Sequence, residues 1–300
     1  MKRTVQQILT GMLVALLVVT YSCKKDQAPA GESSMGDLHM LSQVEKEVAI
    51  DLSTDISDEL IIEEILDEVI SDLEMYDFLK SEGSCPEVSV DRPEEGKYPR
   101  IVTKDFGDGC VTRNGVERSG KIIITIYGKF LEEGSVRTVS FEEYTRNGVA
   151  VSGEKEIVFL GLNEDSLYVH SIKGVIELVK NDTILIKREL RKRRTALAGF
   201  NNPEETKEWL IEGTVLVTRS TGVEYTMKVK EPLHRIQGCK WYQSGVKKIL
   251  FEVNDTGGED GEYTTHQIRI DYGYAESDEA CDNLALRQVD DEEPVVIQLK

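Results

Sequence analysis

The chain has 300 residues, of which 36 are Lys or Arg and 55 are Asp or Glu, so its formal net charge is −19. This balance argues against a nucleic-acid-binding protein, because such proteins neutralise phosphates with Lys and Arg. It equally disfavours direct adhesion to anionic lipid headgroups. Apolar residues make up 40% of the chain, which is enough for a sizeable core in one large domain or two small ones.

Residues 1–22 have the pattern of a secretory signal peptide, in which basic residues precede a short apolar stretch. The apolar run over 8–19 is too short to cross a bilayer, which requires about 20 residues. Ser22 and Cys23 follow it, and this junction resembles the lipobox of bacterial lipoproteins, in which the cysteine becomes the acylated N-terminus. Cleavage after Ala28 or Ala30 is the alternative, and it would release a secreted protein without Cys23.

The lipobox is a relaxed one, since Thr20 stands where leucine is usual and Tyr21 is bulky for its place. Such a box, followed by a Lys-Lys-Asp start, resembles lipoproteins of the Bacteroidota. Lys24 after the acylated position, with no Asp there, favours sorting to the outer membrane. The resemblance therefore implies a protein anchored by lipid, facing either the periplasm or the outside.

Residues 23–36 are predicted to form a flexible tether, and residues 37–84 an acidic helical segment. Residues 37–80 hold 14 acidic residues against Lys46 and Lys80, a local net charge of −12. Five apolar residues recur at helical spacing and form one stripe: Ile62, Leu66, Val69, Leu73 and Tyr76. We expect an amphipathic helix over 57–80 and a weaker one over 40–52, either packed on a sheet or docking a partner.

Residues 85–300 are predicted to form an antiparallel β domain, because Val, Ile and Thr are dense and Gly punctuates the pattern. Short connections imply a meander of long strands, either a curved sheet or an incomplete barrel. The fold class is therefore mainly β with an N-terminal acidic amphipathic helix. The expected strands are 99–106, 119–130, 135–145, 148–161, 166–179, 183–193, 208–218, 222–231, 245–253, 263–271 and 294–299, with loops at 194–207 and 272–293.

An internal repeat supports this interpretation. The sequence Thr-Arg-Asn-Gly-Val occurs at 112–116 and again at 145–149, and nine of 17 aligned positions match between 112–128 and 145–161. Asn-Gly supplies the two positive φ values that a type I′ hairpin turn needs. The repeat therefore predicts two equivalent hairpin turns, each followed by a strand.

Four cysteines remain beyond Cys23, and in an exported protein they suggest two disulfides with three alternative connectivities. The local scheme, Cys85–Cys110 and Cys239–Cys281, is favoured because each bond would join neighbouring strands. A zinc site is the rival interpretation, but the cysteines show neither Cys-x-x-Cys spacing nor a histidine at ligand spacing.

Residues 85–299 resemble a group of uncharacterised Bacteroidota cell-envelope lipoproteins. The resemblance lies in motifs that stand in the family's order: Asp-Phe-Gly-Asp-Gly-Cys at 105–110, Arg-Ser-Gly-Lys-Ile at 118–122, Glu-Pro-Leu at 231–233, Ile-Asp-Tyr-Gly at 270–273 and Cys-Asp-Asn at 281–283. The last two motifs are separated here by residues 274–280, which the family lacks. The resemblance implies a fold type and a location, and no activity.

Catalytic and metal motifs are sparse. The four histidines are scattered (His39, His170, His234 and His266), and the chain lacks a nucleophile elbow, a P-loop and a zincin motif. We therefore predict no catalytic residue, no metal ligand set and no cofactor, although glycosidase-like acid pairs keep a carbohydrate-active enzyme as an alternative. Asp105, Asp108 and the acids of 276–293 are the candidates for a structural calcium site, and Asp-rich turns are the simpler interpretation.

One basic cluster interrupts the acidic chain: Arg191, Lys192, Arg193 and Arg194. Arginine binds phosphate and sulfate in a bidentate manner, so the cluster suits an anionic glycan. Alternatively it faces the acidic segment of the same chain. The sequence as a whole predicts a non-catalytic, lipid-anchored binding or structural module, whose partner is an envelope protein, a glycan or a lipid. A periplasmic carrier of acyl chains is the second hypothesis.

Overall fold

The computed structural model describes Lys46 and residues 85–92, 98–111, 115–129, 131–180, 183–200, 205–254, 263–273 and 281–299. The chain divides into two units, residues 1–33 and 34–300, and every described residue belongs to the second unit. The predictions for the signal peptide, Cys23 and the tether lie outside the described residues, as does the acidic segment apart from Lys46. No helix within the described ranges is long and apolar enough to cross a membrane.

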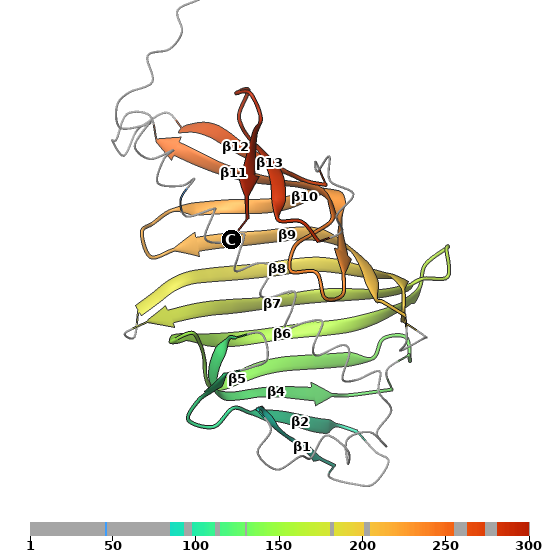
Figure 1. The fold of residues 1–300 in the computed structure, drawn as a ribbon. Helices are drawn as coiled ribbons and strands as arrows, with labels where there is room; N and C mark the ends of the chain where they lie inside the picture. Colours follow the sequence, from blue (N-terminus) through green and yellow to red (C-terminus); the bar gives the residue numbers. More distant parts are fainter. Residues whose placement is uncertain are drawn as a thin grey trace, which may run out of the picture. The chain divides into compact units, whose positions relative to one another are not determined.

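In the part of the chain that the structure describes, fourteen strands form a single antiparallel sheet, in which nearly every strand pairs with its neighbours in the chain (Figure 1). The strands are β1 (Glu87–Asp91), β2 (Arg100–Asp105), β3 (Cys110–Val111), β4 (Glu117–Ile126), β5 (Val136–Arg146), β6 (Val149–Leu162), β7 (Tyr168–Lys180), β8 (Thr183–Ala198), β9 (Glu208–Arg219), β10 (Glu224–Ile236), β11 (Ser244–Asn254), β12 (Tyr263–Tyr272), β13 (Leu284–Val289) and β14 (Val295–Gln298). β3 lies off the main path and pairs with β4. The predicted antiparallel meander is confirmed, and it is open, with β1 and β14 at its two ends.

The predicted strands correspond to eleven of the fourteen, and β1, β3 and β13 were not predicted. The loop prediction over 272–293 is wrong in part, because β13 lies within it and pairs with both β12 and β14. The loop prediction over 194–207 is wrong at its start, because β8 continues to Ala198 and pairs there with β9. Both segments form strands because their backbones pair with neighbouring strands, although their own sequences show only a weak strand pattern.

The second copy of the repeat forms the predicted hairpin turn, whereas residues 112–114 of the first copy lie outside the described residues. Asn147 and Gly148, with φ of 48° and 73°, form the two-residue turn between β5 and β6, as predicted. Gly120 and Gly153 occupy equivalent positions in β4 and β6, with φ of 71° and 107°. A Cβ atom on either glycine would overlap the backbone of the next strand. Both copies of the repeat therefore share a close backbone approach that only glycine allows.

One side of the sheet holds the core. A line of residues paired from strand to strand crosses this side of the sheet. It includes Ile124, Val139, Leu190, Val215 and Ile249, which are all buried. We call this side the buried face. The opposite side, which carries the alternate residues of each strand, we call the open face, and its side chains are mostly polar and accessible. Such alternation is typical of an antiparallel sheet with one solvated side.

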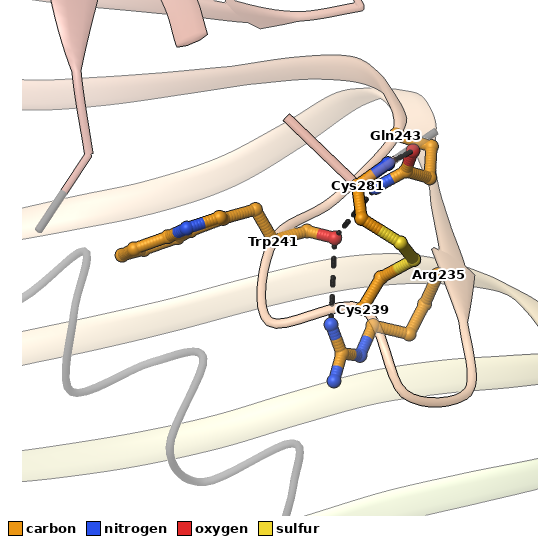
Figure 2. The surroundings of a disulfide bond; sticks show 5 residues. All are labelled: Arg235, Cys239, Trp241, Gln243 and Cys281. Carbon is orange, nitrogen blue, oxygen red and sulfur yellow. Dashed lines mark hydrogen bonds between the residues drawn. A yellow bond between two sulfur atoms is a disulfide. The ribbon is translucent and has the colours of Figure 1, made fainter. Parts of the chain in front are cut away.

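The local disulfide scheme is confirmed. Cys85–Cys110 joins the chain just before β1 to β3, and Cys239–Cys281 joins the β10–β11 loop to the segment before β13. Around the second bond, the Cys281 amide donates to the Gln243 Oε1 atom at 2.7 Å, and Gln243 Nε2 donates to the Trp241 carbonyl at 3.1 Å (Figure 2). The bond therefore fixes a loop that packs Trp241 into the core.

Candidate functional site

Strand β8 divides the predicted basic cluster between the two faces of the sheet. Lys192 and Arg194 lie on the buried face with 7% and 0% of their surface exposed, whereas Arg191 and Arg193 are exposed on the open face. The division follows from the period of two residues in a strand, which sends neighbouring side chains to opposite sides. The four cations therefore do not form one surface patch, and only Arg191 and Arg193 are available to a ligand in solution.

Arg191 belongs to a row of cations that crosses the open face. It is directly paired with Lys173 on β7 and with Thr214 on β9. Thr214 is directly paired with Lys228 on β10. Lys228 is paired in turn with Lys248 on β11, and Lys248 with Arg269 on β12. We call Lys173, Arg191, Lys228, Lys248 and Arg269 the basic row. At about 4.8 Å per strand, it is roughly 24 Å long.

The basic row is electrostatically unfavourable for the sheet itself. Lys173 stands opposite Arg191, and Lys248 stands opposite both Lys228 and Arg269, and like charges directly across a strand pair are destabilising.

Only one end of the row has compensation. Arg269 pairs with Asp271 at 2.7 Å, and Lys248 Nζ donates to Gln267 Oε1 at 2.9 Å. Within the described residues, Lys173, Arg191 and Lys228 form no ion pair. The β7–β10 part of the row is therefore open to an external anion.

An open groove lies at the β7 end of the basic row. It has a volume of about 300 Å³, and its side chains come from Ser171, Lys173, Arg191, Arg193 and Glu212. Ser171 and Arg193 are directly paired across β7 and β8, and Glu212 follows on β9. Three cations and a hydroxyl thus converge with one carboxylate, a donor set that can hold a phosphate or sulfate group.

The buried face has a different composition, in which cations lie among apolar side chains. Nine Lys and Arg residues are buried there, and no Asp or Glu of the described residues is. The nine are Lys104, Arg118, Arg137, Lys155, Arg188, Lys192, Arg194, Arg235 and Lys247. All of them have interaction partners, and three lie over aromatic rings. Arg194 Cζ is 4.0 Å from the centre of the Trp209 ring, which is cation–π geometry.

His170 lies in this cationic environment, where it is 2% exposed. Burial lowers the pKa of its imidazole, and charge repulsion from Arg137 and Arg194 adds to this effect, so that the pKa is about 3. Burial also lowers the pKa of Arg137 to about 10. His170 is therefore neutral at physiological pH, and its ring packs near Phe159 and Phe200.

The enclosed space beneath β9–β11 is small. Its lining includes Ile211, Met227 and Leu233, with Lys192 and Lys247 at its margin, and its volume is about 10 Å³. That is at the lower limit for a single water molecule. An acyl chain would enter this part of the core only after the surrounding side chains had moved.

The remaining candidate residues are separated from one another. Asp105 accepts a hydrogen bond from the Gly107 amide at 2.8 Å, as expected of an Asp-rich turn. His234 pairs with Glu208 at 2.8 Å and His266 with Asp290 at 2.7 Å, in different parts of the sheet. Among the residues that the structure describes, no three His, Cys, Asp or Glu side chains gather at a metal-binding distance.

Comparisons with protein-family models, with curated proteins and with solved structures find no match for this chain. The function must therefore be inferred from the geometry of the sheet. Four members of the basic row, Lys173, Lys228, Lys248 and Arg269, were missed from the sequence because they lie on four different strands, far apart in the chain. The signal was present in the alternation of the predicted strands, but it becomes a row only when the register between strands is known.

Proposed function

We propose that the protein is a non-catalytic binding module of the cell envelope, anchored through an acylated Cys23, and that it binds an anionic glycan on its open face. The observation that carries this proposal is the basic row, in which Lys173, Arg191 and Lys228 are aligned across β7 to β10, with Thr214 between the last two, and form no ion pair within the described residues. A linear polymer bearing phosphate or sulfate groups has the length and the spacing of charge to follow such a row.

The energetics support a binding role for the basic row. Like charges placed directly across a strand pair cost stability, and a bound polyanion would offset that cost. The chain as a whole is acidic, with a net charge of −19, but its repulsion is screened beyond about 8 Å at physiological salt. Binding is therefore expected only at contact distance, and with a modest affinity that falls as salt rises.

The envelope location is supported by two observations of different kinds. Both disulfides form between cysteines close in the fold, and disulfides persist in oxidising compartments outside the cytosol. The N-terminal sequence through Cys23 resembles a lipoprotein signal. Labelling cells with a fatty-acid analogue tests the anchor directly, because Cys23→Ala should abolish incorporation.

The binding proposal is tested by calorimetric titration with a sulfated hexasaccharide and with its desulfated counterpart. We expect only the sulfated form to bind. The variant Arg191→Ala/Lys228→Ala should weaken binding by about tenfold, since each exposed ion pair contributes roughly 0.5–1 kcal/mol.

A control variant, Lys180→Ala/Lys240→Ala, removes two exposed cations that lie away from the basic row. This variant changes the net charge by the same amount as the first one. Because it leaves the basic row intact, it should retain most of the affinity. Equal losses in the two variants would show that net charge alone governs binding, and they would refute the row as a site. Equal binding of the sulfated and desulfated sugars would refute an anionic ligand.

The carrier hypothesis predicts a hydrophobic ligand in the core instead. The space of about 10 Å³ beneath β9–β11 is too small for such a ligand, so this part of the core does not support the carrier hypothesis. Native mass spectrometry of the protein distinguishes the two, because a carrier should retain a hydrophobic adduct and a binding module should not.

A further inference from the structure

Two features of the buried face, its apolar side chains and its buried cations, indicate the chemistry of the element that covers it. Nine buried Lys and Arg residues lie on it, while no Asp or Glu of the described residues is buried. Burying a cation in apolar surroundings is costly unless an opposite charge accompanies it. A single sheet also requires a second layer to bury one of its faces. The element that covers this face must therefore combine apolar side chains with carboxylates.

We propose that the acidic segment 37–80 of the same chain lies across the buried face and supplies the counterions of its Lys and Arg residues. This segment carries 14 acidic residues against two lysines, so its local charge of −12 exceeds the nine positive charges that it would meet. The inference does not depend on the ligand proposed for the basic row, which lies on the opposite side of the sheet.

The pattern within the segment matches the pattern of the buried face. In the helix that the sequence predicts over 57–80, the residues at 62, 66, 69, 73 and 76 form an apolar stripe. At 100° per residue, Asp58, Glu59 and Asp77 lie within about 60° of the centre of that stripe. Carboxylates thus border an apolar strip, just as cations border apolar rows on the sheet.

The dimensions also agree. The nine buried cations are spread over strands β2 to β11, and the sheet order places nine strands in that range. At about 4.8 Å per step, they span roughly 38 Å. A helix over 57–80 would be about 36 Å long at 1.5 Å per residue. A helix crossing the strands can therefore reach the whole set of cations.

The described residues that follow the segment lie on the buried side of the sheet. Cys85 follows the segment closely in the chain and is bonded to Cys110. Together with Val88 and Val90, both cysteines pack against the part of the core formed by β2, β4 and β5. Lys104 and Arg118 lie on these same strands. A segment that ends shortly before Cys85 would therefore meet the buried face where the series of buried cations begins.

Charge-neutralising variants of the full chain test the proposal. Asp58→Asn/Glu59→Gln/Asp77→Asn removes the carboxylates nearest the stripe and should lower the urea midpoint of unfolding by about 1 M or more, because it leaves buried cations without counterions. The matched variant Glu64→Gln/Asp67→Asn/Glu68→Gln removes the same charge from the opposite side of the helix. Its midpoint should shift by less than about 0.3 M. Equal shifts would overturn the proposal.

A chemical measurement covers the case in which the first variant fails to fold. Carbodiimide joins carboxylates to amines in direct contact, so in the wild-type chain it should link Lys155, Lys192 or Lys247 to acidic residues of 55–77. Links from these lysines only to acids of another copy or of a co-purified protein would identify a different cover and overturn the proposal. Native mass spectrometry showing a dimer or a retained lipid, with no such intramolecular links, would do the same.

Discussion

The two sides of β8 show how one run of basic residues can take two opposite roles. Arg191 and Arg193 are exposed on the open face, where charge is solvated and available to a ligand. Lys192 and Arg194 point into the buried face, and the Arg194 guanidinium lies over the Trp209 ring. Basic residues that are adjacent in sequence therefore differ in how much their charge destabilises the folded protein. The comparison teaches that burial, rather than charge pattern, assigns their role.

The largest expected effect contrasts these two pairs directly. The variant Lys192→Ala/Arg194→Ala should lower the free energy of unfolding by about 4 kcal/mol or more, since it removes two large buried side chains and their contacts, among them that of Arg194 with the Trp209 ring. The variant Arg191→Ala/Arg193→Ala makes the same charge change and should cost no more than about 0.5 kcal/mol. Urea denaturation measures both. Similar losses in the two variants would show that the faces do not differ energetically.

The next prediction concerns Gly213, which lies opposite Lys192 with φ of 126°. A Cβ atom there would overlap the carbonyl oxygen of Arg191, so Gly213→Ala should force β8 and β9 apart. We expect a loss of about 3 kcal/mol, from backbone strain and steric overlap together.

Gly222 provides the control for this substitution. It also has a positive φ, of 83°, but a Cβ atom would meet nothing within 4 Å. Gly222→Ala should therefore cost only about 1 kcal/mol, as measured by the same urea titration. If the two glycine variants were equally stable, the close approach of β8 to β9 would be unimportant to the buried face.

A pH titration sharpens the comparison further. The pKa of His170 is lowered to about 3 in the folded protein, from 6.5 for an unperturbed imidazole. Between these values the unfolded state binds the proton and the folded state does not, so stability falls as pH drops below 6.5. The loss from this group should be about 2 kcal/mol between pH 7.5 and pH 5.

The variant His170→Gln lacks that titration, so its unfolding free energy should vary less over the same range. The comparison is made by denaturation at pH 7.5, 6 and 5. A His170→Gln profile that parallels the wild type would mean that the imidazole is accessible to protons in the folded state.

The smallest effect is expected on the open face of β8. Lys187 and Glu189 form an ion pair of 3.1 Å, in which both side chains are 42% exposed. Glu189→Gln should change the free energy of unfolding by less than about 0.5 kcal/mol, because solvent screens the pair. A loss comparable with that of the Lys192/Arg194 variant would contradict the solvated character assigned to this side.

Much of the fold could be predicted from the sequence, because its signals are local. The Asn-Gly turn at 147–148 imposes positive φ values that few other residues adopt, and its hairpin is confirmed. The disulfide pairing was also predicted correctly, since closeness in the chain of a meander implies closeness in space. β13 was missed because its strand conformation depends on the partners β12 and β14.

The candidate site was predicted only in part. Arg191 and Arg193 belong to a conspicuous cluster, whereas Lys173, Lys228 and Arg269 are single cations in mixed sequences. Nothing local relates these three residues to one another. Their alignment depends on the register of five successive strand pairings, which a one-residue slip would abolish.

The sequence by itself determined the antiparallel meander, the hairpin turn and the supply of cations, since turn chemistry and strand alternation act between near neighbours. Only the tertiary structure decided which side of each strand is buried, and therefore which cations stand free on the open face and which require counterions. The physical reason is that the environment of a charge is set by the layers packed around it. Those layers are assembled from residues far apart in the chain.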